Sequence, residues 1–210
     1  MKLELYSEQL KRLPADGKQI IGHISGHSIV VYQAFNSGIA NYAIKHQRFG
    51  GPHYSFNRMS WIKPGFLWMM HRAGWAAKEH QQQILAITLP IEKFKLILSQ
   101  ATLSACDGQI YATQQEWKQE LERTEVRLQW DPDHDPFGIK QNRRAIQLGL
   151  KGDILKLFAT QWIEHIEDIT PFVKQEFEKV KNNSIEKLML PYEEVLSITE
   201  PELIHRLGIN

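Results

Sequence analysis

The sequence predicts an α+β fold, with a mixed, mainly antiparallel sheet and helices packed on it in a single domain. Two observations lead to this prediction. Runs that are typical of strands and helices follow one another without the regular alternation of a parallel α/β sheet. No internal repeat and no Gly/Ser- or Pro-rich linker divides the 210 residues. We therefore expect residues 1–17 to be an N-terminal extension and residues 18–210 to form one domain.

The first half of the chain is expected to begin with two strands joined by a short turn that contains Gly26. The β-branched run Ile29–Val31 suits a strand that is buried on both faces. Ser37 is a candidate helix cap, and a proline and a glycine bound the second helix. The expected elements are strands at Gln19–Ile24 and Ser28–Phe35 and helices at Ser37–Gln47 and Pro64–Ala73.

The second half alternates less regularly between strand and helix patterns. Thr113 and Glu116 have the spacing of a capping box, and apolar residues from Ile154 to Ile166 recur at helical spacing. Residues 131–142 are rich in turn formers and are expected to be a loop. The expected elements are strands at Ile84–Leu89, Val126–Trp130 and Arg144–Leu150 and helices at Pro90–Gln100, Thr113–Arg123, Gly152–Ile166 and Thr170–Lys181.

Composition excludes several classes of protein. Hydrophobic residues make up 42% of the chain and charged residues 23%, which argues against disorder and fibrous structure. The single cysteine, Cys106, excludes an intrachain disulfide and a Cys-based zinc site, and we expect it to be a small buried residue. No apolar run approaches the roughly 18 residues of a membrane span, and the charged N-terminus is not a signal peptide. We expect a soluble, cytoplasmic protein with no membrane partner.

Charge is distributed unevenly along the chain although the net charge is only +1. Residues 17–78 contain seven Lys or Arg, ten aromatic residues and no acid. Cations interleaved with aromatic rings are typical of surfaces that bind phosphates and bases, so a nucleic acid is one candidate partner. The alternative is that the aromatic residues form core and the cations pair with acids elsewhere in the domain.

The segment 56–75 carries the strongest indication of a ligand. A helix that begins at Pro64 leaves its first N–H groups free, and Arg58 and Lys63 lie just before it, so an anion is expected to bind there. Arg72 is expected at the other end of this helix. Structural salt bridges are the alternative role for these cations. The segment lacks the glycine spacing of a P-loop or of a dinucleotide fold.

Two expected strands carry polar side chains among apolar ones. Alternation places Arg127, Gln129 and Asp131 on one face of the first strand and Gln147 on one face of the second, which begins at Arg144. Buried amides need partners, because an unsatisfied polar group costs about 1–3 kcal/mol. Either a ligand or the neighbouring backbone meets this need.

Other chemistries have weaker support in the sequence. The acidic run from Asp131 to Asp135 is expected to be a solvated turn, so no metal site is predicted there. The Gly-x-Ser-x-Gly pattern of a serine hydrolase does not occur. The sequence identifies no cofactor and no oligomeric state.

Five segments of the chain resemble the DUF4291 family, a domain of unknown function, over roughly residues 18–208. The segments are Val31–Phe35, Arg58–Trp75, Gln129–Pro132, Arg144–Leu150 and Ile166–Pro171, of which the Arg-Met-Ser-Trp-Ile-Lys-Pro run is the most specific. The resemblance implies no reaction, cofactor or catalytic residue. This chain has Ile21 and Val30 where members of the family have arginines, which puts in doubt any role of those two positions in binding an anion.

Three functions remain open on these residues. The first is a nucleotide-handling enzyme, with a transferase as one form of it, in which polar side chains converge in one cleft. Arg58 and Lys63 would hold phosphates, Trp61 or Trp68 would stack on a base, and Asp131 or Asp168 would act as general base or orient a hydroxyl. The candidate ligand-binding residues are Gln33, Arg58, Trp61, Lys63, Arg72, Gln129, Arg144 and Gln147.

The strand-helix arrangement is also loosely similar to that of ADP-ribosyltransferases, although no His-Tyr-Glu or Arg-Ser-Glu pattern can be assigned. The second function is a non-catalytic module that binds single-stranded nucleic acid through residues 17–78. The third is an interaction protein in which the unusual residues are structural.

Overall fold

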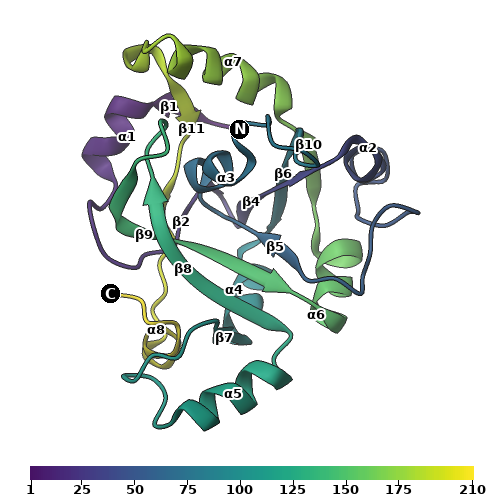
Figure 1. The fold of residues 1–210 in the computed structure, drawn as a ribbon, viewed down its shortest axis with the longest axis vertical. Helices are drawn as coiled ribbons and strands as arrows, with labels where there is room; N and C mark the ends of the chain where they lie inside the picture. The colour runs from purple at the N-terminus through teal and green to yellow at the C-terminus, as the bar shows by residue number, and fades with distance from the viewer.

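Two four-stranded sheets form the centre of the computed structural model, which describes residues 1–210 (Figure 1). One sheet has the order β10-β6-β4-β3, formed by His165–Asp168, Gln83–Pro90, Ser28–Phe35 and Ile24–Ser25. The other has the order β5-β9-β8-β7, formed by Ser60–Ile62, Lys140–Leu150, Val126–His134 and Ala101–Leu103. Neighbouring strands are antiparallel except for the parallel pair β7–β8. The predicted α+β class is therefore confirmed.

The two large sheets meet where β4 lies beside the residue that follows β5. The Tyr32 N–H donates to the Lys63 carbonyl oxygen at 2.7 Å, and the Lys63 N–H donates to the Tyr32 carbonyl oxygen at 3.2 Å. The Gln33 side chain crosses the same junction, because its Nε2 donates to the Trp61 carbonyl oxygen at 3.1 Å. The backbone thus fixes Lys63 at the boundary between the sheets.

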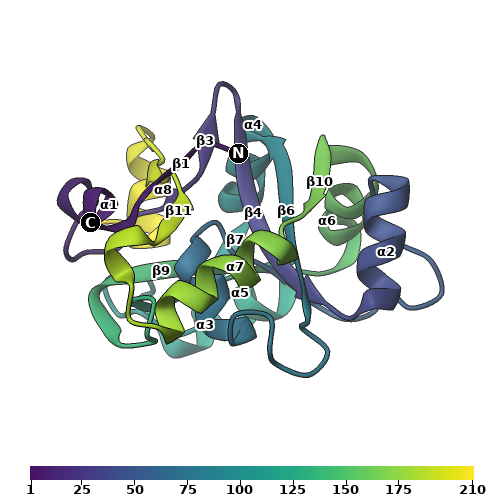
Figure 2. The same cartoon turned by 90° about the horizontal axis from the view of Figure 1, so that it is seen from above.

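Two short strand pairs join the ends of the chain to the rest. β1 (Leu3–Leu5) pairs with β11 (Met189–Pro191), and β2 (Ile21–Gly22) pairs with β12 (Glu194–Val195). The N-terminal and C-terminal segments therefore lie side by side, as Figures 1 and 2 both show.

Eight α-helices surround the sheets. They are α1 (Tyr6–Arg12), α2 (Ser37–His46), α3 (Phe66–Ala73), α4 (Ile91–Ser99), α5 (Gln114–Arg123), α6 (Gly152–Leu157), α7 (Thr170–Lys181) and α8 (Pro201–Leu207). A π-helical turn, Phe158–Trp162, follows α6, and a 3-10 turn, Ile185–Lys187, precedes β11. None of these helices combines the length and the hydrophobicity that a membrane crossing requires.

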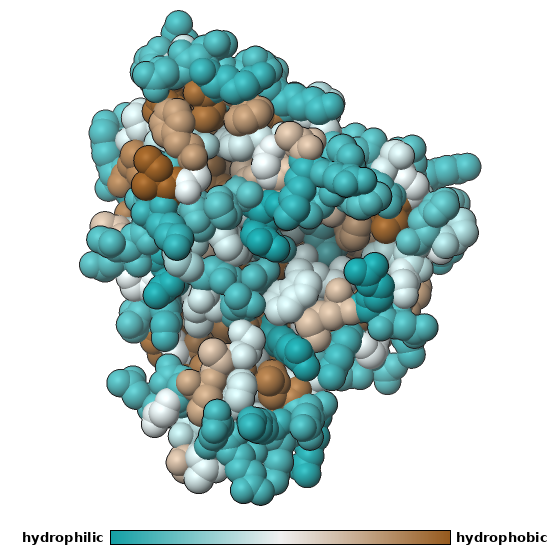
Figure 3. Space-filling view, viewed as in Figure 1, coloured by the Kyte–Doolittle hydropathy of each residue, from teal (hydrophilic) through white to brown (hydrophobic).

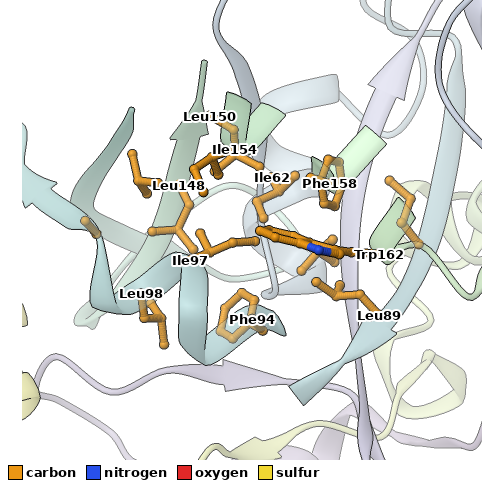
Figure 4. Close-up of a cluster of buried hydrophobic side chains, with 14 of the residues drawn as sticks. Ile62, Leu89, Phe94, Ile97, Leu98, Leu148, Leu150, Ile154, Phe158 and Trp162 are labelled. Carbon is orange, nitrogen blue, oxygen red and sulfur yellow. The ribbon is translucent and has the colours of Figure 1, made fainter. Parts of the chain in front are cut away.

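The alternation of side chains along β4 and β6 separates two hydrophobic cores. Ile29 and Val31 point into the larger core, which α4 and α6 cover and which Figure 4 shows around Phe94, Ile97 and Phe158. Val30 and Tyr32 point into the smaller core, which contains side chains of α3 and α7. Figure 2 shows α4 on one side of these strands and α3 and α7 on the other. The prediction of a strand buried on both faces is confirmed.

Several element boundaries differ from those predicted. The expected strand Gln19–Ile24 is split into β2 and β3, which pair with different partners. The expected helix Gly152–Ile166 ends at Trp162, because residues 165–168 pair with β6 as a strand. The side chain of Asn36, and not of Ser37, caps α2 by accepting the Ile39 N–H at 3.1 Å. Cys106 is exposed and not buried.

Asn183, just after α7, offers a test of backbone strain. Its φ of 54° lies in the left-handed region, where a glycine has no steric cost, and its side chain is exposed. We expect Asn183→Gly to raise the free energy of unfolding by about 0.5–1 kcal/mol in urea titrations. The neighbouring Asn182 has a φ of −87°, so Asn182→Gly is the matched control and should lower it. Equal changes in the free energy of unfolding for the two variants would contradict a left-handed backbone at Asn183.

Candidate functional site

A polar cleft lies over one face of the strands β5, β9 and β8, the face that is turned away from the larger core. Along β5, Ile62 points into the larger core, so alternation sends Trp61 and Lys63 to the opposite face. β8 and β9 follow the same rule, because Leu128 and Leu148 lie in that core. Gln129, Asp131 and Gln147 therefore share the face of Trp61 and Lys63, and α3 folds back over this face.

Two glutamines on paired strands hold the carboxylate of Asp131. Gln129 Nε2 donates to Asp131 Oδ1 at 2.8 Å, and Gln147 Nε2 donates to Asp131 Oδ2 at 2.8 Å. Gln129 and Gln147 lie directly opposite each other across β8 and β9. The strand amides thus find a side-chain partner, and not the backbone that was one of the two expectations. Their arrangement fixes the orientation of Asp131 in the cleft.

Helix α3 contributes the other wall of the cleft. Trp68, Met69 and Arg72 project from one face of the helix and line the cleft, while Phe66 and Met70 anchor the helix in the smaller core. The cleft has a volume of about 880 Å³. It brings together eight of the residues expected at the site, namely Gln33, Arg58, Trp61, Lys63, Arg72, Gln129, Asp131 and Gln147.

The cations of the cleft have no acidic partner. Arg58, Lys63 and Arg72 form no salt bridge, although ten other pairs in the chain do. Lys63 is the most unusual of the three, because its side chain is 6% exposed and makes no hydrogen bond. Burial, reinforced by the nearby charge of Arg72, lowers the pKa of Lys63 to about 8. The alternative that structural salt bridges occupy these cations does not hold.

The expected anion site at the start of the helix is already filled by the protein itself. The Phe66 N–H, at the first residue of α3, donates to Glu193 Oε1 at 2.7 Å. Glu193 is only 4% exposed, and its burial raises its pKa to about 8. The prediction that a ligand binds the helix start was wrong, because a carboxyl group from the C-terminal segment takes that place. The free cations face the cleft instead.

Two of the expected site residues lie elsewhere. Arg144 shares the strand face of Ile146 and Leu148, opposite that of Gln147, so alternation turns it away from the cleft. Asp168 lies at the end of β10, where its Oδ1 accepts the Thr170 N–H at 2.9 Å and so caps the start of α7. It lines an adjoining hollow with Glu79 and Lys174, which shares Asn36 and His80 with the cleft. The structure does not bring either residue to Lys63.

Most aromatic residues of the basic segment 17–78 are part of the cores. The buried ones are Tyr32, Phe49, Phe66, Trp68 and Trp75. Trp68 is 5% exposed, and its ring stacks with those of His71 and His134, at centroid distances of 5.4 Å and 5.2 Å. Trp61 is half-buried and lines the cleft. Of the seven cations only Lys18 forms a salt bridge, with Asp107 at 3.8 Å.

Sequence reasoning missed several polar residues that line the same cleft. They are Asn36, His53, Ser55, Ser60, His80 and Gln81. Asn36 and Ser60 were within reach of the sequence, because Asn36 directly follows Val31–Phe35 and Ser60 lies inside the segment 56–75. His80 and Gln81 come from the loop after α3, and no pattern in the sequence shows that this loop returns to the cleft. The surface on the side of Figure 3 is largely hydrophilic, with hydrophobic side chains gathered at its upper left.

Ile21 and Val30, at which the resemblance leads one to expect arginines, lie outside the cleft. Val30 is buried in the smaller core, and Ile21 lines a small cavity beside Glu193 and Arg143. Neither side chain reaches the group of free cations.

Gly149 allows Trp61 to lie flat over β9, and its substitution tests that packing. A Cβ at this position would be 2.5 Å from Met59 Sδ and 2.9 Å from the ring of Trp61. We expect Gly149→Ala to displace Trp61 and lower the free energy of unfolding by about 1–3 kcal/mol. Gly65→Ala is the control, because its nearest atom would be 3.7 Å away. Urea titrations that show no loss for Gly149→Ala would contradict this packing.

Comparison with known proteins agrees with the resemblance seen in the sequence. No curated protein sequence matches the chain. The profile of DUF4291, a domain of unknown function, matches residues 19–196. This range includes both large sheets and every residue of the cleft. The chain therefore belongs to the DUF4291 family.

Proposed function

We propose that this protein binds a nucleotide or another phosphorylated small molecule in the cleft beside Lys63, and that it acts on this ligand as an enzyme of the transferase type. One observation carries the proposal: a buried lysine without a partner, accompanied by two unpaired arginines, lines a cleft large enough for such a ligand. An ammonium group that is removed from water without a partner is costly, so a site that keeps one is suited to an anion.

The walls of the cleft suit the remaining parts of a nucleotide. Trp61 offers a half-buried ring on which a base can stack. Gln33 has an Oε1 that is buried and accepts no hydrogen bond, so a ligand hydroxyl or amine near it would satisfy this oxygen. These groups supply the few polar contacts that orient a ligand in a pocket.

Asp131 is the group that we assign to chemistry. It is the only carboxylate that lines the cleft, and the amides of Gln129 and Gln147 hold both of its oxygens. A carboxylate in this position accepts a proton from a ligand hydroxyl or orients that hydroxyl toward an electrophile. We assign no chemistry to Asp168, because it does not line the cleft and accepts the Thr170 N–H at the start of α7.

A panel of ligands tests the proposal. Thermal unfolding is followed with AMP, ATP, NAD and a single-stranded oligonucleotide, and the binding of any active compound is then measured by calorimetry. We expect a mononucleotide or dinucleotide to raise the melting temperature, because a ligand that binds only the folded state stabilises it. No shift with any of the small ligands at millimolar concentration would overturn the proposal.

The oligonucleotide separates this function from nucleic-acid binding. A surface that binds single strands would give an affinity that falls steeply with salt, since each phosphate contact releases counterions. The three free cations lie in one cleft and not along an open face, so we expect the oligonucleotide to bind more weakly than the mononucleotide.

A further inference from the structure

The amino group of Lys63 has the surroundings of a reactive amine. Its side chain is almost fully buried and forms no salt bridge, although the charge of Asp131 reaches it from the same cleft. The backbone bonds to Tyr32 on both sides of the residue fix where the side chain starts. Lys63 lines the cleft beside Arg72, Asp131 and Gln147.

A nucleophilic amine must be neutral, and a base must lie nearby to receive its proton. Arg72 and Asp131 are the groups near Lys63 that bear on these two requirements. Desolvation, and after it the charge of Arg72, lowers the pKa of Lys63 and favours the neutral form, which carries the lone pair, while the charge of Asp131 acts in the opposite direction. Asp131 lies on the same face of the sheet and is held by the two glutamines, so it can receive a proton. Buried lysines of this kind serve as nucleophiles toward carbonyl groups.

We propose that Lys63 is a nucleophile that forms an imine with the aldehyde carbon of a phosphorylated reducing sugar, while Arg58 and Arg72 hold the phosphate. This inference rests on the proposed function and adds the reactive group of the ligand. The sugar is either a simple sugar phosphate or the free reducing sugar of a nucleoside diphosphate, since both carry the same aldehyde and phosphate.

The step balances without an added oxidant or reductant. The lone pair of Lys63 Nζ forms a bond to the aldehyde carbon, and the C=O π pair moves to the oxygen. Asp131 accepts one proton from the nitrogen and delivers it to this oxygen, which becomes a hydroxyl. Asp131 then accepts the second proton of the nitrogen and delivers it to the hydroxyl, which leaves as water while the C=N bond forms. The net products are an imine and one water molecule.

The charges of the cleft favour this ligand over a magnesium-bound nucleoside triphosphate. Magnesium in such sites is held by carboxylates together with the phosphates, and Asp131 is the only carboxylate here. The phosphate is instead neutralised by the two arginines directly. The unpartnered Gln33 Oε1 provides an acceptor for a sugar hydroxyl.

Reductive trapping tests the inference on the full chain. The protein is incubated with ribose 5-phosphate, ADP-ribose or unphosphorylated ribose in the presence of cyanoborohydride, which reduces an imine to a stable amine. Peptide mass spectrometry then locates the adduct. We expect it on Lys63, with a yield at least about tenfold higher for the phosphorylated compounds than for ribose. A higher yield for ADP-ribose than for ribose 5-phosphate would assign the nucleotide form.

Two variants and one parallel measurement separate the possible failures. Lys63→Arg keeps the charge and should bind AMP in calorimetry but give no adduct in the cleft. Exposed Lys78 reports the background reaction of surface lysines. Binding of the phosphorylated sugars with no adduct on Lys63 above that background would overturn the inference and leave the proposed function intact. Absence of both binding and adduct would overturn both, and an equal yield with ribose would overturn the phosphate requirement.

Discussion

Replacing Lys63 by methionine is expected to weaken binding of the phosphorylated ligand and at the same time to stabilise the free protein. Methionine keeps a similar length and fills the same buried space without a charge. The loss of a buried, charge-assisted contact should weaken binding about 10- to 100-fold. A lysine that served packing or a structural ion pair would show the opposite behaviour, because its removal would destabilise the fold.

The gain in stability follows from the pKa of Lys63. This pKa falls from its ordinary value of 10.5 to about 8 in the folded protein. The shift means that folding destabilises the charged form of Lys63, relative to the neutral form, by about 3 kcal/mol. The unfolded chain therefore keeps the proton between pH 8 and 10.5 while the folded protein has lost it. The destabilisation of the folded state by the buried Lys63 charge is therefore greatest below pH 8 and disappears as the pH rises toward 10.5. We expect Lys63→Met to gain about 1–3 kcal/mol at pH 7 and to lose this pH dependence.

Urea titrations at several pH values and calorimetry with the active nucleotide measure both effects. Lys78→Met is the control, since Lys78 is an exposed cation of the same basic segment. This change should leave the affinity and the free energy of unfolding nearly unchanged. A Lys63→Met protein that unfolds more easily than wild type, or that binds the nucleotide with unchanged affinity, would show that Lys63 is structural.

The second large effect is expected at Glu193, which caps helix α3 from the opposite end of the chain. Glu193→Gln keeps an oxygen that can accept the Phe66 N–H, so we expect it to stabilise the protein at pH 7 by about 1–3 kcal/mol. Glu193→Ala leaves that buried N–H without an acceptor and should be about 1–3 kcal/mol less stable than the glutamine variant.

The direction of the pH effect at Glu193 is opposite to that at Lys63. The folded protein holds the Glu193 proton up to about pH 8, whereas the unfolded chain releases it near 4.5. The contribution of Glu193 to the free energy of unfolding is therefore largest below pH 4.5, and it falls as the pH rises toward 8. The advantage of Glu193→Gln should be absent near pH 4.5 and grow with pH, which urea titrations across this range would measure. A constant difference between the two proteins would contradict a buried, protonated Glu193.

The sequence was sufficient to predict the long, strongly patterned elements of the fold. The β-branched run in β4 and the two alternating strands β8 and β9 were expected within a few residues. Short strands such as β5 and β7 were not predicted, because a run of three residues shows too little periodicity to be distinguished from a loop. The sequence pattern predicts a helix end at β10, because the apolar Ile166 continues the helical spacing of α6, whereas the pairing of β10 with β6 is a long-range contact.

The candidate site was predicted through its residue types more than through its geometry. The alternation of Gln129, Asp131 and Gln147 could be derived from the sequence, and their hydrogen bonds agree with it. The occupation of the helix start by Glu193 could not be derived, because more than a hundred residues separate the two groups along the chain. Arg144 was included for its position in the strand, although the same alternation places it on the other face.

The central claim is that the free cations of the cleft receive a negatively charged ligand, and a crystal structure of the protein with AMP tests it most directly. AMP has no free aldehyde to occupy Lys63, so we expect its phosphate within hydrogen-bond distance of Lys63 Nζ, with Arg58 and Arg72 directed toward it and Asp131 still held by Gln129 and Gln147. A phosphate bound at another part of the surface, with Lys63 left unpartnered in the cleft, would contradict the claim.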